Sequence, residues 1–75
     1  MNDILQIPRI EIRPDDQPHL TLHTINGARH IPFVGDTIRI DDEEFIVTRA
    51  KSIYRFDNGT LLPRTVDVYV TEITS

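Results

Sequence analysis

The chain has 75 residues, no cysteine and a formal net charge of −4 at pH 7. This length predicts a single small domain over residues 1–75, and the missing cysteines exclude disulfides and cysteine-based metal sites. The acidic balance argues against general nucleic-acid binding. Because the sequence shows no secretory segment and no membrane span, we expect a cytoplasmic protein.

The N-terminal part of the chain predicts one strand and one loop. Residues 1–6 are expected to be frayed. Ile10 and Ile12 alternate with charged side chains, which is typical of a strand over 7–13 with one buried face. Proline, aspartate and glutamine fill 14–18, so this stretch is expected to be a loop.

A second strand is predicted over 19–25, followed by the dipeptide Asn26-Gly27. This dipeptide is typical of a type I′ hairpin turn, in which both central residues take positive φ. Counting outward from that turn predicts a short third strand over 29–31 and places His23 opposite His30. Opposed residues have Cβ atoms about 5 Å apart, which is close enough for two imidazoles to share a metal ion.

A fourth strand is predicted over 37–41, ending in a turn at Asp42-Glu43 that contains no glycine. The register that keeps the apolar residues on one face places Ile40 opposite Phe45 on the following strand.

The most informative stretch is 45–74, which predicts one long C-terminal β-hairpin. Its turn is the dipeptide Asn58-Gly59, again typical of type I′ geometry. Counting outward from this turn gives facing pairs along both strands. These pairs include Phe56 with Leu61, Arg49 with Val68, Val47 with Val70 and Phe45 with Glu72.

This register puts the apolar residues near the base and those near the tip on opposite faces of the hairpin. A straight hairpin cannot bury both sets on one side, because side chains alternate with period two. One resolution is a β-bulge between Arg49 and Ile53, which would reverse the alternation. The other is a tip that extends past the core and packs on a partner chain.

The six predicted strands together indicate an all-β fold. Short strands joined by tight turns predict a small antiparallel meander, rolled into an SH3-like barrel or a two-layer sandwich. The pattern P-x-V-G-D-x-I-x-I at 32–40, followed by F-x-V and V-x-V-x-V, resembles that of many small SH3-like barrels. It covers about half of the chain and implies no particular function.

No residue pattern in the chain indicates catalysis. No motif places a nucleophile on a strained turn, and a domain of this size has little room for a deep pocket. The acidic run 41–44 lacks the alternating ligands and the central glycine of a calcium loop and predicts a solvated turn. His23 and His30 supply only two ligands. We therefore expect a non-enzymatic protein without cofactor or metal site.

The tip of the long hairpin is the predicted binding surface. Aromatic residues and arginine are enriched in the energetically dominant parts of protein interfaces. The expected function is protein binding, beginning with self-association into a homodimer, by a module of the size of phage or mobile-element accessory factors and small bacterial regulatory proteins. The predicted interface residues are Tyr54, Arg55, Phe56, Leu61, Leu62 and Pro63.

An alternative function is nucleic-acid binding by the basic face of the same hairpin. Basic side chains alternate along one strand, with aromatic residues close by, and could hold a single strand by charge and stacking. The competing interpretation is a solvated outer face. The residues of this alternative site are Arg49, Lys51 and Arg55, with Arg64 expected opposite Ile53.

Overall fold

A computed structural model describes residues 7–73, and the predicted frayed segment 1–6 lies outside them. All the regular structure in this range is β-strand. The strands are β1 (Ile7–Pro14), β2 (His23–Ala28), β3 (Thr37–Ile40), β4 (Glu43–Ile53), β5 (Phe56–Asp57), β6 (Thr60–Leu61) and β7 (Thr65–Glu72). In the part of the chain described, no helix has the length and apolar character needed to cross a lipid bilayer.

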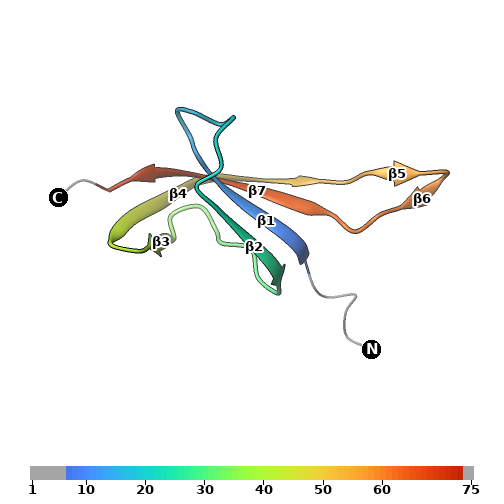
Figure 1. Ribbon diagram of the computed structural model, residues 1–75, viewed down its shortest axis with the longest axis horizontal. Helices are drawn as coiled ribbons and strands as arrows, with labels where there is room; N and C mark the ends of the chain where they lie inside the picture. The colour runs from blue at the N-terminus through green and yellow to red at the C-terminus, as the bar shows by residue number, and fades with distance from the viewer. Residues whose placement is uncertain (1–6, 74–75) are drawn as a thin grey trace.

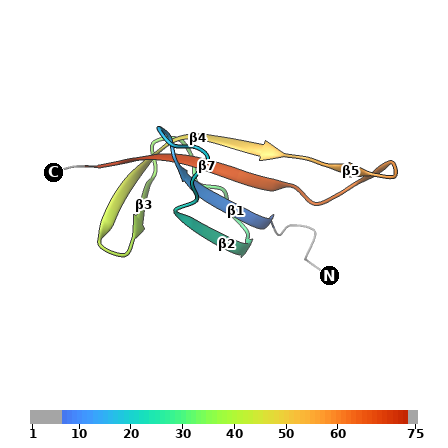
Figure 2. The same ribbon diagram turned by 45° about the horizontal axis from the view of Figure 1, so that its top comes forward.

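Five strands form one curled sheet in the order β2-β1-β7-β4-β3, and β5 with β6 forms a separate two-stranded sheet (Figure 1). Turned about its long axis, the larger sheet curves like half of a barrel (Figure 2). The predicted all-β class with a long C-terminal hairpin is therefore confirmed, and the curled sheet is consistent with a small β-barrel.

The core lies on the concave face of this half-barrel. Alternate residues of the three central strands point into it, as the period of a strand requires. Burying each such side chain contributes roughly 1.5–3 kcal/mol. The most completely buried side chains are Ile10, Ile12, Val47, Val66, Val68 and Val70.

One strand pairing differs from an antiparallel meander. β1 runs parallel to β7, from Arg9 opposite Thr65 to Pro14 opposite Val70, and the other pairs in the sheet are antiparallel. The first strand is thus inserted between β2 and the last strand. This position covers both of its edges and buries Ile10 and Ile12 almost completely.

The prediction of a hairpin at Asn26-Gly27 is wrong. Both residues lie inside β2, which begins at His23 and pairs with β1 so that Ile25 lies opposite Ile10. Gly27 has a φ of 74°, but Asn26 is not among the residues with positive φ, so the two do not form a type I′ turn. The predicted strands 19–25 and 29–31 are replaced by this single strand.

The β3–β4 hairpin is tighter than predicted. Ile38 lies opposite Phe45 and Ile40 lies opposite Glu43, so the predicted pairing of Ile40 with Phe45 is wrong by two residues. The turn is Asp41-Asp42, and Asp41 takes a φ of 55°, which aspartate tolerates better than most side chains. A shift of two residues leaves every side chain on its predicted face.

The long hairpin has its predicted turn. Asn58 and Gly59 have φ values of 53° and 79°, and the pairs Phe56–Leu61, Val47–Val70 and Phe45–Glu72 are as expected. A β-bulge does interrupt the ladder, but between Val47 and Arg49, earlier than predicted. As a result Arg49 lies opposite Tyr69 and not opposite Val68.

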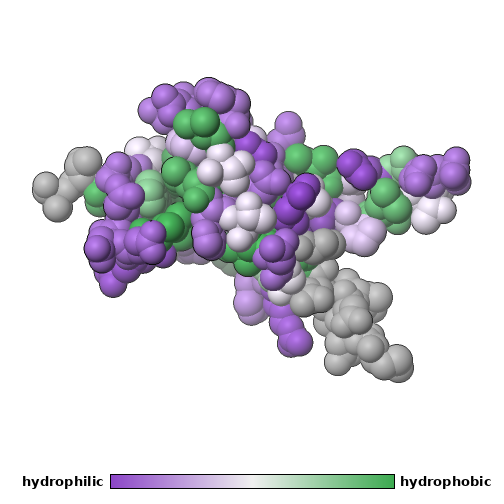
Figure 3. All heavy atoms as spheres, in the orientation of Figure 1, coloured by the Kyte–Doolittle hydropathy of each residue, from purple (hydrophilic) through white to green (hydrophobic). Residues whose placement is uncertain are grey.

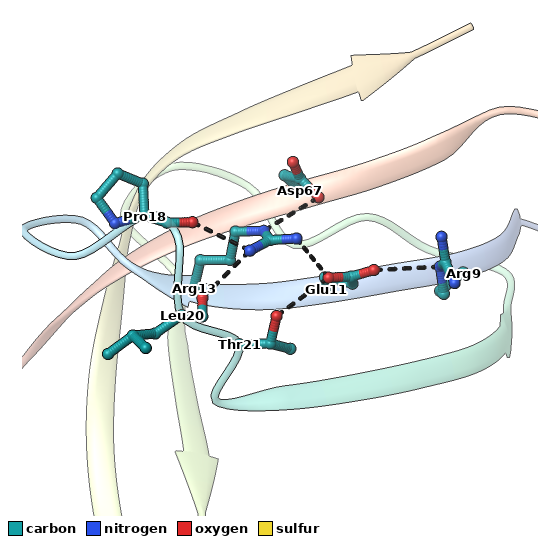
Figure 4. A network of polar contacts seen from close by, with 7 residues as sticks. All are labelled: Arg9, Glu11, Arg13, Pro18, Leu20, Thr21 and Asp67. Atoms are coloured by element: carbon teal, nitrogen blue, oxygen red, sulfur yellow. Dashed lines mark hydrogen bonds and ion pairs between the residues drawn. The ribbon is translucent and has the colours of Figure 1, made fainter. Parts of the chain in front are cut away.

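A polar network on the convex face attaches the 15–22 loop to the sheet (Figure 4). The Arg13 guanidinium donates to the carbonyl oxygens of Pro18 and Leu20 at 3.0 and 3.3 Å, and its Nε lies 3.5 Å from Asp67 Oδ1. Glu11 accepts from Arg13 and from the Thr21 hydroxyl. Because Arg13 and Glu11 are only about one-fifth exposed, these pairs are less screened by water than ordinary surface ion pairs.

Candidate functional site

Residues 54–64 form a projecting arm that carries the predicted interface. Within the arm, β5 pairs only with β6, and the five-stranded sheet ends its β4–β7 ladder at the Ile53–Thr65 pair. The arm extends well beyond the half-barrel in both ribbon views (Figures 1 and 2). It accounts for much of the length of a molecule whose extents are 47 × 26 × 18 Å.

The apolar side chains of the arm are exposed. Tyr54, Phe56 and Leu61 retain 58%, 65% and 54% of their accessible surface. Apolar surface on the arm, at the right in Figure 3, is separate from the apolar surface over the curled sheet. The bulge before Arg49 reverses the alternation along β4, but the tip lies beyond the five-stranded sheet and its apolar side chains stay exposed. The tip therefore extends past the core, as in the second sequence interpretation.

The remaining predicted interface residues gather at the base of the arm. Arg55, Leu62 and Pro63 line a shallow depression of about 290 Å³ together with Arg9, Ile53 and Thr65. Arg9 is paired with Glu11 at 3.2 Å, whereas no ion pair involves Arg55 within residues 7–73. The depression therefore combines an apolar lining with an uncompensated positive charge.

The residues of the alternative basic site differ in their contacts within the chain. Arg49 stacks 4.0 Å above the Tyr69 ring and lies 3.4 Å from Asp15, but its side chain is 56% exposed and can still face a further carboxylate. Arg64 donates weakly to the Ser52 and Tyr54 hydroxyls. Thr65, and not Arg64, lies opposite Ile53, so that expected pairing is wrong.

The two histidines do not face each other. His23 lies opposite Ile12 at the start of β2, and His30 follows the end of the same strand. The hairpin that would have opposed them does not exist, so the geometric basis for a shared metal ion is lost. Among residues 7–73, no cluster of three or more histidine, aspartate or glutamate side chains is placed to hold a metal ion.

The end of the molecule away from the arm is acidic. Arg39, four acids of the β3–β4 turn region, Glu72 and Ile73 line an open depression of about 520 Å³. A hydrogen bond with Glu72 is the main cause that raises the pKa of Glu43, and the charges of Glu72 and Asp41 add to it. A hydrogen bond with Glu44 raises the pKa of Arg39 in the same region.

Sequence reasoning missed a second exposed apolar feature, the turn at Phe33-Val34. These side chains are 76% and 66% exposed, although the turn that carries them is well fixed. The Phe33 N–H donates to the Asp36 carboxylate at 2.8 Å, and the Gly35 N–H donates to the Val47 carbonyl at 2.9 Å. The available signal was two large apolar residues inside an otherwise turn-forming stretch.

Comparisons of the chain with protein-family models, curated proteins and solved structures find no match.

Proposed function

We propose that the protein is a non-enzymatic binding module that associates with protein, first with a second copy of itself, through the arm. The supporting observation is that Tyr54, Phe56 and Leu61 are more than half exposed on a hairpin that pairs with no other strand. Several large apolar side chains exposed together on one hairpin are more typical of a contact site than of a solvated face.

The low stability expected of the arm on its own supports the same proposal. An isolated two-stranded hairpin is marginally stable at best in water. A partner that covers its apolar side chains would supply the burial that the arm lacks. Burying two aromatic side chains and a leucine in each chain contributes several kcal/mol, at roughly 1.5–3 kcal/mol for each large side chain. Lost translational and rotational freedom offsets part of this gain.

A two-fold axis is the simplest arrangement for such a contact. In a two-fold dimer the same patch on each chain covers the other, and this is by far the commonest oligomer symmetry. Two arms packed side by side would each hide Phe56 and Leu61, which face each other across the turn. Arg55 would lie at the rim, where a charge can remain hydrated.

Sedimentation equilibrium on the wild type and on Phe56→Asp tests this proposal. The wild type is expected to sediment as a dimer at micromolar concentration, and the variant as a monomer, because a buried carboxylate disfavours the apolar contact. Phe33→Asp is the matched control, since Phe33 is also an exposed phenylalanine and lies outside the arm. A monomeric wild type at high micromolar concentration, or equal dissociation by both variants, would overturn the proposal.

A further inference from the structure

Half of β4 has an unpaired edge. β3 covers β4 only along Glu43–Ile46, and the backbone of Val47 is bonded on the same side by Gly35 and Asp36. Beyond the bulge, β7 is the only strand in the described chain that pairs with β4. The edge of β4 that faces away from β7 is therefore open along residues 49–53, which we call the free edge.

The direction of the backbone groups along the free edge follows from the ladder. Val47 turns its N–H and C=O away from β7, so Val47–Val70 is a pair without mutual hydrogen bonds. Alternation along β7 then makes Tyr69, Asp67 and Thr65 the residues that bond to β4. Their partners are Arg49, Lys51 and Ile53. The N–H and C=O groups of Ala50 and Ser52 consequently point outward, where a further strand could bond to them.

The side chains along the free edge leave room for such a strand. Ala50 and Ser52 lie on the concave face, opposite the fully buried Val68 and Val66, and both are small and exposed. An added strand would therefore continue the half-barrel and bring its own side chains against this core.

The charges along the free edge decide which strand fits. A two-fold pairing of two copies centred on Lys51 sets that lysine opposite its own copy. The neighbouring registers set Arg49 opposite Lys51 or opposite Arg55. Like charges directly opposed across strands are destabilising, and charged side chains on an edge are a common protection against self-pairing. Pairing with a second copy is therefore disfavoured by the same side chains that would attract an acidic segment.

We propose that the free edge of β4 binds an extended acidic segment of a partner protein as an additional strand. Backbone bonds to Ala50 and Ser52 supply the affinity. Alternate carboxylates opposite Arg49 and Lys51 supply the selectivity. Lys51 is available for this role, because no ion pair involves it within residues 7–73. This site is separate from the arm and does not require dimerisation.

The probe for this proposal is a blocked heptapeptide of alternating valine and glutamate, titrated into the isotope-labelled full chain and followed by NMR. The amide signals of Ala50 and Ser52 are expected to shift and their hydrogen exchange to slow, because these N–H groups become bonded. The control peptide carries lysine in place of glutamate and should bind about ten-fold more weakly or not at all.

Two variants separate strand addition from loose electrostatic attraction. Lys51→Glu is expected to weaken binding of the glutamate peptide about ten-fold and to strengthen binding of the lysine peptide. Ser52→Pro removes an outward N–H without breaking the ladder to β7, so it should abolish binding while the Val66 and Val68 signals stay in place. If Ser52→Pro does not fold, the reversal of peptide preference expected for Lys51→Glu still tests the proposal.

The proposal is overturned if millimolar glutamate peptide leaves the Ala50 and Ser52 amides unchanged. It is also overturned if both peptides bind equally and Lys51→Glu changes neither affinity. The peptide experiment reads amide signals, whereas the arm experiment reads molecular mass, so either proposal can fail while the other stands.

Discussion

The half-barrel and the arm both consist of paired β-strands, but they differ in how far their apolar side chains are buried. Both consist of hydrogen-bonded strand pairs with apolar side chains, and only the β1–β7 pair of the half-barrel is parallel. In the half-barrel, Ile12, Val66 and Val68 are 0% exposed, whereas Phe56 on the arm is 65% exposed. Hydrogen-bonded pairing is therefore common to both regions, and burial is what distinguishes a self-sufficient core from a hairpin that needs a partner.

The largest expected effect comes from removing a core side chain. Ile12→Ala should lower the free energy of unfolding by about 2–5 kcal/mol, because it removes buried methyl groups and leaves a cavity. Leu61→Ala is the matched control on the arm. It should change the free energy of unfolding by less than about 0.5 kcal/mol in dilute, monomeric protein. Urea denaturation measures both. Similar losses for the two variants would contradict the distinction between core and arm.

Gly59→Ala tests whether the arm can be disturbed alone. Gly59 has a φ of +79°, and a Cβ there meets no atom within 4 Å, so the cost is backbone strain only. Strain of this kind is about 1–2 kcal/mol. We expect weaker cross-strand NOEs between Phe56 and Leu61 with an unchanged unfolding midpoint of the sheet. Asn58→Gly keeps both turn positions permissive and should preserve these NOEs. A lowered midpoint would show that arm and core unfold together.

Thr48 joins the bulge of β4 to the 15–22 loop. Its hydroxyl lies 2.7 Å from an Asp15 carboxylate oxygen and 3.1 Å from the Tyr69 carbonyl oxygen. Thr48→Val should lower the free energy of unfolding by about 0.5–1.5 kcal/mol, because the bond is lost at nearly constant volume. Asp15→Asn keeps a side-chain oxygen that can accept from the Thr48 hydroxyl, so it should lower the free energy of unfolding by less. Equal stability of Thr48→Val and wild type in urea would contradict this role.

The smallest expected effect concerns the acidic end. The folded protein holds the Glu43 proton to higher pH than the unfolded chain, because the hydrogen bond with Glu72 raises the pKa of Glu43. The associated stabilisation is present at low pH and is lost as pH rises through the raised pKa. Glu72→Ala removes both the hydrogen-bond acceptor and the charge, so it should lower the pKa of Glu43 toward its ordinary value. A carboxyl-carbon NMR titration that finds the same pKa in both proteins would contradict the assigned cause.

The sequence specifies the local parts of this fold well. Asn58-Gly59 forms its predicted turn because the residues on both sides continue as paired strands. Asn26-Gly27 carries the same signal and forms no turn, because β1 supplies a better partner for β2 and buries Ile25 against the core. A turn dipeptide is thus decisive only where no distant strand competes for the same residues.

The pairing of strands that are far apart in the sequence could not be predicted from local sequence patterns. The parallel pairing of β1 with β7 joins the two ends of the chain, and alternation along each strand is the same whichever neighbour it takes. A bulge was expected from the mismatch of the two apolar faces, but it lies between Val47 and Arg49, where Thr48 bonds to Asp15, a residue far away in the sequence. The six predicted interface residues do lie together on or beside the arm, because they follow from the correct turn.

The central place of β1 also bears on how the protein folds. The strands β2 to β6 lie between Arg9 and Thr65 along the chain, so the pairing of these two residues must wait until β7 has been synthesised. Closing so long a loop has a large entropic barrier, and contacts between distant residues slow folding. The β4–β7 hairpin, whose strands meet through a tight turn, is expected to form first. β1 then adds to it, so the core cannot be completed on the ribosome before β7 has been synthesised.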